Sequence, residues 1–252
     1  MTIDRGAWPG YRGREGREAG AGREGGVSEA AVLTQVPLFA AFAAEELEPL
    51  VACLRRRRYA RGETVFLQGD PGTSLCLIET GRVKLGFTSP EGREVLLDLL
   101  GQGDVFGELA LLDGEPRSAD AVAVEPTQLL LLRREEFVRF LEERPRLAIQ
   151  LLAVLSRRLR RDAQLVQDAA FLDVPARLAR ILLRLAESEG EASEEGLVIR
   201  ARLTQSDLAG LVGTTRETLN KWLAFYEAQG LIRWDKGQIT VRRPEALRKR
   251  IY

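Results

Sequence analysis

The chain has 252 residues, of which 45% are hydrophobic and 29% are charged, enough for two modest folded domains with apolar cores. Its 37 basic and 37 acidic residues give a net charge of zero, which argues against a generally basic coat for nucleic acid, so any DNA binding has to be local. It has no histidine and two cysteines, which excludes a His-ligated haem, a His-bearing zinc finger, a His general base and a four-thiolate iron–sulfur site.

The first 26 residues form a Gly-, Arg- and Glu-rich segment without apolar periodicity. Such a segment buries too little apolar surface to offset the entropy of ordering, so we expect residues 1–28 to be a disordered tail. An Arg–Gly tract that touches nucleic acid and a translation start near Val27 are alternative interpretations. Because neither a secretion signal nor an apolar run of membrane-spanning length is present, we expect a cytoplasmic location without membrane contact.

A helix is predicted over residues 43–54, and the arginines Arg55 to Arg58 are interpreted as a solvated run that complements its C-terminal dipole. Short β-type runs separated by Gly-rich turns follow at residues 63–67, 74–79, 83–87, 94–99, 121–124 and 128–132. Strands this short and closely spaced predict an antiparallel barrel or jelly roll. Cys53 and Cys76 lie in apolar sequence and are expected to fill core space.

Between two of these strands lies the stretch 103–122, GDVFGELALLDGEPRSADAV. Gly107 lets backbone approach a bound group, Glu108 can accept hydrogen bonds from a sugar hydroxyl, and Arg117 with Ser118 can hold a phosphate. A surface Glu–Arg ion pair, stabilising by at most about 1 kcal/mol, is the alternative. The stretch resembles the phosphate-binding cassette of cyclic-nucleotide-binding domains, which implies ligand contacts at Gly107, Glu108, Leu109, Arg117, Ser118 and Ala119.

A helix over residues 133–144 and a long helix from Pro145 to about Leu172 are predicted next. Apolar residues recur along the long helix at spacings of three and four, which is typical of a two-stranded coiled-coil seam. The seam positions are Leu152, Leu155, Leu159, Asp162, Val166 and Ala169. The long helix is therefore expected to form a homodimer. Asp162 lowers the stability of such a seam, and a polar residue there is usually kept for register or for a task.

A hinge at residues 171–175, FLDVP, leads to a predicted helix over residues 176–186, an acidic loop over 188–195 and a strand over 197–199. Residues 203–232 then predict two helices joined by a turn at Gly213. We expect Thr204 to cap the first helix with Asp207, and Thr214 to cap the second with Glu217 in a capping box.

This helix pair predicts a helix-turn-helix, in which the first residues of the second helix enter the DNA major groove. The outward residues there are Thr215, Arg216, Glu217, Asn220 and Lys221. Arg and Lys can donate to guanine and Glu can accept from cytosine, although Glu217 could instead be only the capping carboxylate. A hairpin wing around residues 235–237 and the basic residues beyond it, Arg242, Arg243, Arg248, Lys249 and Arg250, are expected to contact phosphates.

Through the cassette, the FLDV motif and the recognition-helix residues, residues 32–252 resemble the cyclic-AMP receptor (CRP/FNR) family of bacterial transcription regulators. The resemblance implies an α+β fold with an N-terminal antiparallel, jelly-roll-like β-roll sensor at residues 29–144, a dimerisation helix at 145–172 and a winged helix-turn-helix at 173–252. It implies double-stranded promoter DNA, a second copy of the chain and RNA polymerase as partners. The implied DNA-binding residues are Thr204, Thr214, Thr215, Arg216, Glu217, Asn220 and Lys221.

The resemblance implies cyclic AMP as ligand, but one part of the family pattern is missing. Where the family presents a Thr–Ser pair to the adenine ring, this chain has Asp162 and Ala163, while Arg158 matches a family arginine near the phosphate. An ionised Asp162 accepts but does not donate, which suits the N–H groups of a guanine, as in cyclic di-GMP. Regulation without ligand, and an ion pair of Asp162 with Arg158 or Arg161 across the dimer, are further alternatives.

The sequence thus predicts a sequence-specific DNA-binding transcription regulator under allosteric control by a cyclic nucleotide. A cyclic-nucleotide domain can also be the regulatory part of an enzyme or channel. Because the sequence offers no recognisable catalytic lysine, metal cluster or Ser–His pair, we expect no catalytic residues, no metal site and no enzymatic activity.

Overall fold

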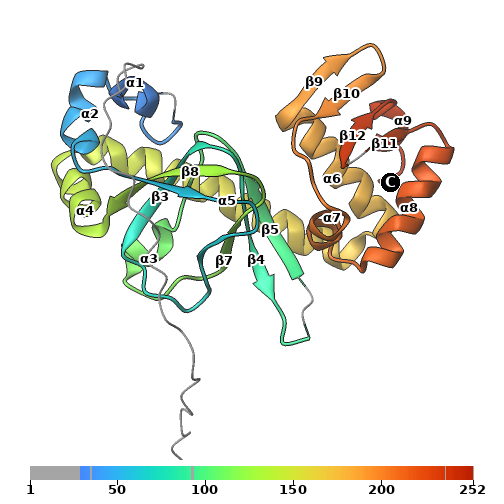
Figure 1. Ribbon diagram of the computed structural model, residues 1–252, viewed down its shortest axis with the longest axis horizontal. Helices are drawn as coiled ribbons and strands as arrows, with labels where there is room; N and C mark the ends of the chain where they lie inside the picture. The colour runs from blue at the N-terminus through green and yellow to red at the C-terminus, as the bar shows by residue number, and fades with distance from the viewer. Residues whose placement is uncertain (1–28, 35, 92–93, 236, 252) are drawn as a thin grey trace, which may run out of the picture.

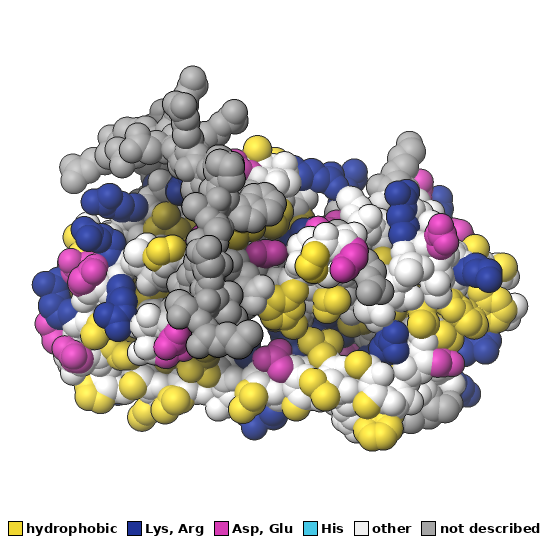
Figure 2. All heavy atoms as spheres, turned by 90° about the horizontal axis from the view of Figure 1, so that it is seen from below, with side chains coloured by type: hydrophobic (Ala, Val, Ile, Leu, Met, Phe, Trp, Pro, Cys, Tyr) yellow, Lys and Arg dark blue, Asp and Glu magenta, His cyan; other side chains and the backbone are white. Residues whose placement is uncertain are grey.

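The computed structural model describes residues 29–34, 36–91, 94–235 and 237–251. The tail predicted at residues 1–28 lies outside the described residues, and the proposed domain limits stay a prediction. No helix in the described residues has both the length and the apolar character of a membrane span. The view in Figure 2 has basic and acidic side chains interspersed, so this face carries no continuous basic coat.

The N-terminal half is built on two four-stranded antiparallel sheets. One sheet has the order β1 (Arg55–Tyr59), β8 (Thr127–Arg133), β3 (Ser74–Thr80) and β6 (Val105–Phe106), and the other has the order β2 (Thr64–Phe66), β7 (Asp120–Ala123), β4 (Val83–Thr88) and β5 (Glu94–Leu100). One core cluster, which includes Cys76, Ile78, Phe106 and Leu129, joins strands of both sheets. Apolar residues of short strands are thereby buried between two layers, so the predicted β-roll is confirmed.

A second core covers the other face of the β1–β8–β3–β6 sheet. It joins α1 (Glu29–Thr34), α2 (Ala44–Val51), α4 (Arg134–Glu143) and the first turns of α5 (Pro145–Phe171) to β3 and β8. Phe39, Phe137 and Leu147 are almost fully buried there. In Figure 1 the long helix α5 runs behind the β-roll and leads toward the C-terminal half.

The arginine run does not extend a helix: α2 ends at Val51, and residues 55–58 belong to strand β1, paired with β8. Arg56 bonds to Glu79 (2.7 Å) and Arg58 Nε donates to Gln128 Oε1 (2.7 Å), while Arg57 stacks over the Tyr59 ring at 5.0 Å. The run is largely exposed, as expected, but its interpretation as a helix end was wrong because pairing with a distant strand satisfies this backbone, which a local charge pattern does not reveal.

The C-terminal half packs α6 (Val174–Glu189), α7 (Gln205–Val212), α8 (Arg216–Ala228) and α9 (Pro244–Arg248) with a small sheet around a third core. That sheet has the order β11 (Ile232–Asp235), β12 (Gln238–Val241), β10 (Gly196–Ile199) and β9 (Gly190–Ser193). The segment predicted as an acidic loop contains β9, because Gly190–Ser193 pairs with β10 in a hairpin despite its polar composition. The α+β fold with a helix-turn-helix and wing is as predicted.

The first helix cap agrees with the prediction and the second does not. Thr204 Oγ1 accepts from the Asp207 amide (3.0 Å), and Asp207 Oδ2 accepts from the Thr204 amide (3.1 Å). The cap of α8 is Thr215, whose hydroxyl accepts from the Thr218 amide (3.2 Å), rather than Thr214. The tight left-handed turn at Gly213 places the helix start one residue later, which frees Glu217 from a capping role.

Candidate ligand cavity and nucleic-acid interface

A cavity of about 430 Å³ lies between the β-roll and α5. All eight residues predicted to contact a ligand line it: Gly107, Glu108, Leu109, Arg117, Ser118, Ala119, Arg158 and Asp162. The first six come from the loop and short helix α3 (Glu108–Asp113) between β6 and β7, and the last two come from α5. The fold thus brings the cassette and the long helix to the same cavity.

Gly107 is the N-cap of α3 and has a left-handed backbone with φ of 78°. A Cβ at this position would lie 2.3 Å from Arg117 Nη1, so the turn and the close approach both require glycine. The turn connects the buried strand β6 to Glu108, which is 2% exposed.

The Arg117 guanidinium is held by backbone and by an aromatic ring. Nη1 donates to Gly107 O and Nη2 to Ser74 O, both at 2.7 Å, and the group lies 4.3 Å from the centre of the Phe66 ring. Burial lowers the pKa of Arg117, although an arginine stays protonated in proteins. A fixed positive charge therefore lies at the cavity wall.

Two buried polar atoms at the cavity have no hydrogen-bond partner among the described residues, Glu108 Oε2 and Arg117 Nε. The other Glu108 oxygen accepts from Arg158 Nη1 at 2.5 Å, and Arg158 Nη2 also donates to Val105 O. Leaving a buried donor or acceptor unpaired costs about 1–3 kcal/mol. The cassette thus offers one acceptor and one charged donor to a bound group.

Asp98 is a cavity residue that the sequence prediction missed. It lies on β5, is 9% exposed and pairs with Arg161 of α5. A carboxylate inside the apolar run LLDLL was the available signal. Because Arg158 pairs with Glu108 and Arg161 with Asp98 within this chain, Asp162 lines the cavity without either arginine as partner among the described residues.

The predicted DNA-binding residues gather on α7, α8 and the turn between them. Thr204, Thr215, Arg216, Glu217 and Lys221 are exposed, and Thr214 and Asn220 are partly exposed. The opposite stripe of α8, formed by Leu219, Leu223 and Tyr226, is buried. The first turns of α8 therefore present a polar face outward.

Several basic side chains beyond the wing are engaged elsewhere. Arg242 pairs with Glu195 (3.0 Å), Arg248 pairs with Glu187 (2.9 Å), and Arg250 stacks on the Phe225 ring. Phosphate contacts by Arg242 and Arg248 would have to replace these ion pairs.

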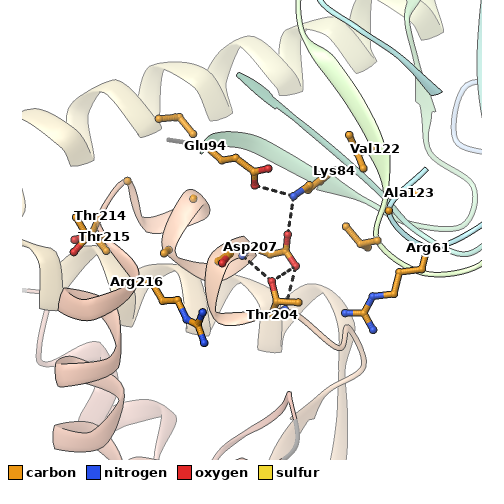
Figure 3. A pocket seen from close by; sticks show the side chains of 17 residues that line it. Arg61, Lys84, Glu94, Val122, Ala123, Thr204, Asp207, Thr214, Thr215 and Arg216 are labelled. Carbon is orange, nitrogen blue, oxygen red and sulfur yellow. Dashed lines mark hydrogen bonds and ion pairs between the residues drawn. The ribbon is translucent and has the colours of Figure 1, made fainter. Parts of the chain in front are cut away.

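A cleft of about 860 Å³ separates the β-roll from α7 and α8 (Figure 3). Lys84 of β4 bridges it, donating to Glu94 Oε2 (2.8 Å) and to Asp207 Oδ1 (2.9 Å). Burial lowers the pKa of Lys84, but the two carboxylates outweigh it and raise the pKa above its usual value. A Cβ added to Gly210 of α7 would lie 2.9 Å from Leu96 Cγ, so the helix packs closely on β5.

In the part of the chain that the structure describes, no group of three metal-ligating side chains comes together.

Residues 56–144 match the cyclic nucleotide-binding domain and residues 176–250 match the Crp-like helix-turn-helix domain. The chain is 36% identical over 219 residues to the CRP-like cAMP-activated global transcriptional regulator of Mycobacterium tuberculosis, covering 87% of this chain and 98% of that protein. It is 40% identical over 207 residues to the cyclic AMP receptor protein of Thermus thermophilus, covering 82% and 92%. The solved c-di-GMP responsive global regulator of Xanthomonas campestris superimposes with a TM-score of 0.70 and 27% identity, covering 79% and 99%.

Proposed function

Because this chain belongs to the CRP/FNR family of transcription regulators, we propose that it binds promoter DNA in a sequence-specific way, as a dimer under the control of a cyclic nucleotide. The relatives are named as regulators, which argues for a regulator rather than an enzyme. Contact with RNA polymerase on promoter DNA, in the cytoplasm, is part of the same proposal.

The observation that carries ligand control is the pair of unpartnered buried atoms in the cassette, Glu108 Oε2 and Arg117 Nε. A ribose hydroxyl can donate to the first, and a phosphate oxygen can accept from the second. The Ser118 hydroxyl and the positive charges of Arg117 and Arg158 suit the same phosphate. A surface ion pair, the alternative interpretation, does not require a cavity or buried groups.

The base of the nucleotide would face α5, where Asp162 lines the cavity. We propose cyclic AMP as the ligand, supported by the names of the relatives in Mycobacterium and Thermus. A guanine messenger such as cyclic di-GMP is the second candidate, because Asp162 accepts hydrogen bonds and a similar fold belongs to a c-di-GMP responsive regulator. Regulation without ligand is the third.

Isothermal titration calorimetry with cyclic AMP, cyclic GMP and cyclic di-GMP separates the three candidates. We expect saturable binding of cyclic AMP, and a loss of at least ten-fold in affinity in Glu108→Gln, because the carboxylate is replaced by a neutral acceptor. Glu115→Gln, which makes the same change on the exposed side of the cassette, is the matched control. Failure of all three nucleotides to bind would overturn ligand control.

The mechanism we propose is a population shift in a dimer joined along α5. A ligand that touches both the cassette and α5 would favour the dimer geometry that spaces two α8 helices about 34 Å apart, one turn of DNA. Cyclic AMP should therefore raise the affinity for a selected duplex, and Arg117→Met should abolish that increase. Equal affinity with and without cyclic AMP, for a protein shown to bind it, would contradict the mechanism.

A further inference from the structure

We propose that Gln205 is a positioning residue that holds Arg216 in the orientation in which it reads a base pair. The inference rests on the proposed DNA-binding function and adds a residue that the sequence did not single out. Gln205 is the first residue of α7, whereas Arg216 is the first residue of α8. The contact therefore crosses the turn of the helix-turn-helix.

The half-buried Gln205 side chain ties two residues of α8 together. Its Oε1 accepts from Arg216 Nε at 3.0 Å and from Asn220 Nδ2 at 3.3 Å. Arg216 itself is exposed. A long arginine on a surface would otherwise sample many rotamers, and fixing such a side chain at an interface costs about 0.5–1.5 kcal/mol.

The direction of the hydrogen bonds is set by Arg216. A guanidinium only donates, so Gln205 has to turn its carbonyl oxygen toward it. Asn220 then has to turn its NH₂ group toward the same oxygen, which leaves its own Oδ1 buried without a partner among the described residues.

The hydrogen bond from Arg216 Nε to Gln205 leaves the other edge of the guanidinium available to DNA. Nε is occupied by Gln205, whereas in the described part of the chain Nη1 and Nη2 of Arg216 make no hydrogen bond that competes with DNA. These two nitrogens form the fork that matches O6 and N7 of guanine. Gln205 thus favours the end-on approach of Arg216 to a guanine and disfavours the approach through Nε.

The competing explanation is that Gln205 only stabilises the packing of α7 against α8. The two explanations differ in their effect on discrimination between DNA sequences. The probe is a duplex that the full-length wild-type protein selects from a random-sequence pool in the presence of cyclic AMP. Fluorescence anisotropy measures the affinity of the protein for this selected duplex and for a scrambled duplex. Each G·C pair of the selected site is then replaced in turn. The pair that Arg216 contacts is the one whose replacement lowers the affinity of the wild-type protein but not that of Arg216→Met.

Gln205→Met keeps the size of the side chain and removes the acceptor. We expect the ratio of selected to scrambled affinity to fall three- to ten-fold, with the scrambled affinity and the thermal midpoint unchanged. In the Arg216→Met background, Gln205→Met should have no further effect on that ratio, because the residue it positions is gone. Gln205→Glu keeps the acceptor oxygen and should retain the ratio of selected to scrambled affinity. Its negative charge is expected to lower the affinities for the two duplexes equally.

An equal loss on both duplexes in Gln205→Met, or a full additional loss in the Arg216→Met background, would overturn the positioning role. So would failure of Gln205→Glu to retain the ratio while it stays folded. If the wild-type protein selects no sequence at all, the proposed function fails first and the inference falls with it. Selection by the wild type with an unchanged ratio in Gln205→Met overturns only the inference.

Discussion

At the scale of single residues, the burial and incomplete pairing of the Glu108 carboxylate distinguish the cassette from a surface ion pair. Arg158 satisfies one of its oxygens and leaves the other buried and unpaired in the described chain. Since a buried carboxylate oxygen without a partner is unfavourable, its retention is easiest to understand if a ligand donates to it. Arg117 shows the same arrangement with the opposite sign, because its Nε is buried and unpaired.

The cap of α8 gives a prediction that separates two adjacent threonines. The Thr215 hydroxyl accepts from the Thr218 amide, so Thr215→Ala should lower the free energy of unfolding by about 1 kcal/mol. Thr214→Ala is the matched control and should change it by less than about 0.5 kcal/mol. Urea denaturation measures the free energy of unfolding of both variants. A larger loss of stability in Thr214→Ala than in Thr215→Ala would show that Thr214 is the cap, as predicted from the sequence.

Tyr226 gives a prediction about alkaline pH. The residue is 1% exposed, its hydroxyl donates to Pro175 O (2.8 Å), and burial raises the pKa of Tyr226 to about 12 from an ordinary value near 10. The folded state thus favours the protonated phenol. The contribution to stability is complete below about pH 10 and is lost as the pH rises toward 12, a change of up to about 3 kcal/mol.

Tyr226→Phe removes this titration, so the stability of the variant should fall less steeply than that of the wild type between pH 10 and 12. At pH 8 the variant should be less stable by about 1 kcal/mol through loss of the hydrogen bond. Denaturant titrations at pH 8, 10 and 11.5 make the comparison. Parallel pH profiles would show that the phenol is not held neutral by the fold.

At the scale of elements, α5 has an apolar stripe that the described residues leave exposed. Leu152, Leu159 and Val166 are between 62% and 71% exposed, although they recur with the spacing of a coiled-coil seam. Leu155, one position of the same seam, is partly buried and also lines the ligand cavity. A second copy of the helix would cover the stripe and would lie directly beside the cavity.

Leu159→Glu should therefore convert a dimer into a monomer, because it places a charge in an apolar seam. Analytical ultracentrifugation at micromolar concentration measures the change. Leu67→Glu, the same substitution at a β-roll leucine that is 44% exposed, is the matched control and should stay dimeric. Sedimentation of the wild-type protein as a monomer would contradict the dimer proposal.

At the scale of the whole molecule, the DNA-binding half is attached to the β-roll by more than the chain. Lys84 pairs with Asp207 at the start of α7, and Arg82 pairs with Glu189 at the end of α6 (2.6 Å). Leu96 and Leu99 of β5 belong to the same core cluster as the C-terminal helices. The start of β4 and strand β5 therefore form a junction between the β-roll and the helix-turn-helix.

Lys84→Met should loosen this junction, because it leaves the buried Asp207 without its charged partner. We expect faster hydrogen exchange of the α7 amides, by about ten-fold or more, with little change in the strands of the β-roll. Lys221→Met removes an exposed lysine and is the matched control. Unchanged exchange in α7 would mean that the remaining contacts, the Arg82–Glu189 ion pair and the apolar packing of β5, suffice to hold α7 in place.

The sequence alone predicted most of what depends on a few neighbouring residues. The six predicted β-roll strands, the long helix and the cap at Thr204 follow from periodicity and local side-chain chemistry, and each lies within one or two residues of its predicted place. Strands β1 and β6 were not predicted, and the dimer seam along the long helix stays a prediction. The eight residues that the resemblance to the family implied as ligand contacts all line one cavity, and their contact with a ligand stays a prediction.

Only the tertiary structure decided which distant residues meet. Arg56 becomes part of a strand because β8 pairs with it, Asp98 reaches Arg161 across the cavity wall, and Lys84 bridges to Asp207 of the other half. Gln205 reaches Arg216 because of the turn at Gly213 between their helices. A sequence pattern records the preferences of neighbours along the chain, whereas these partners are chosen by packing, which brings together residues between 11 and 123 positions apart.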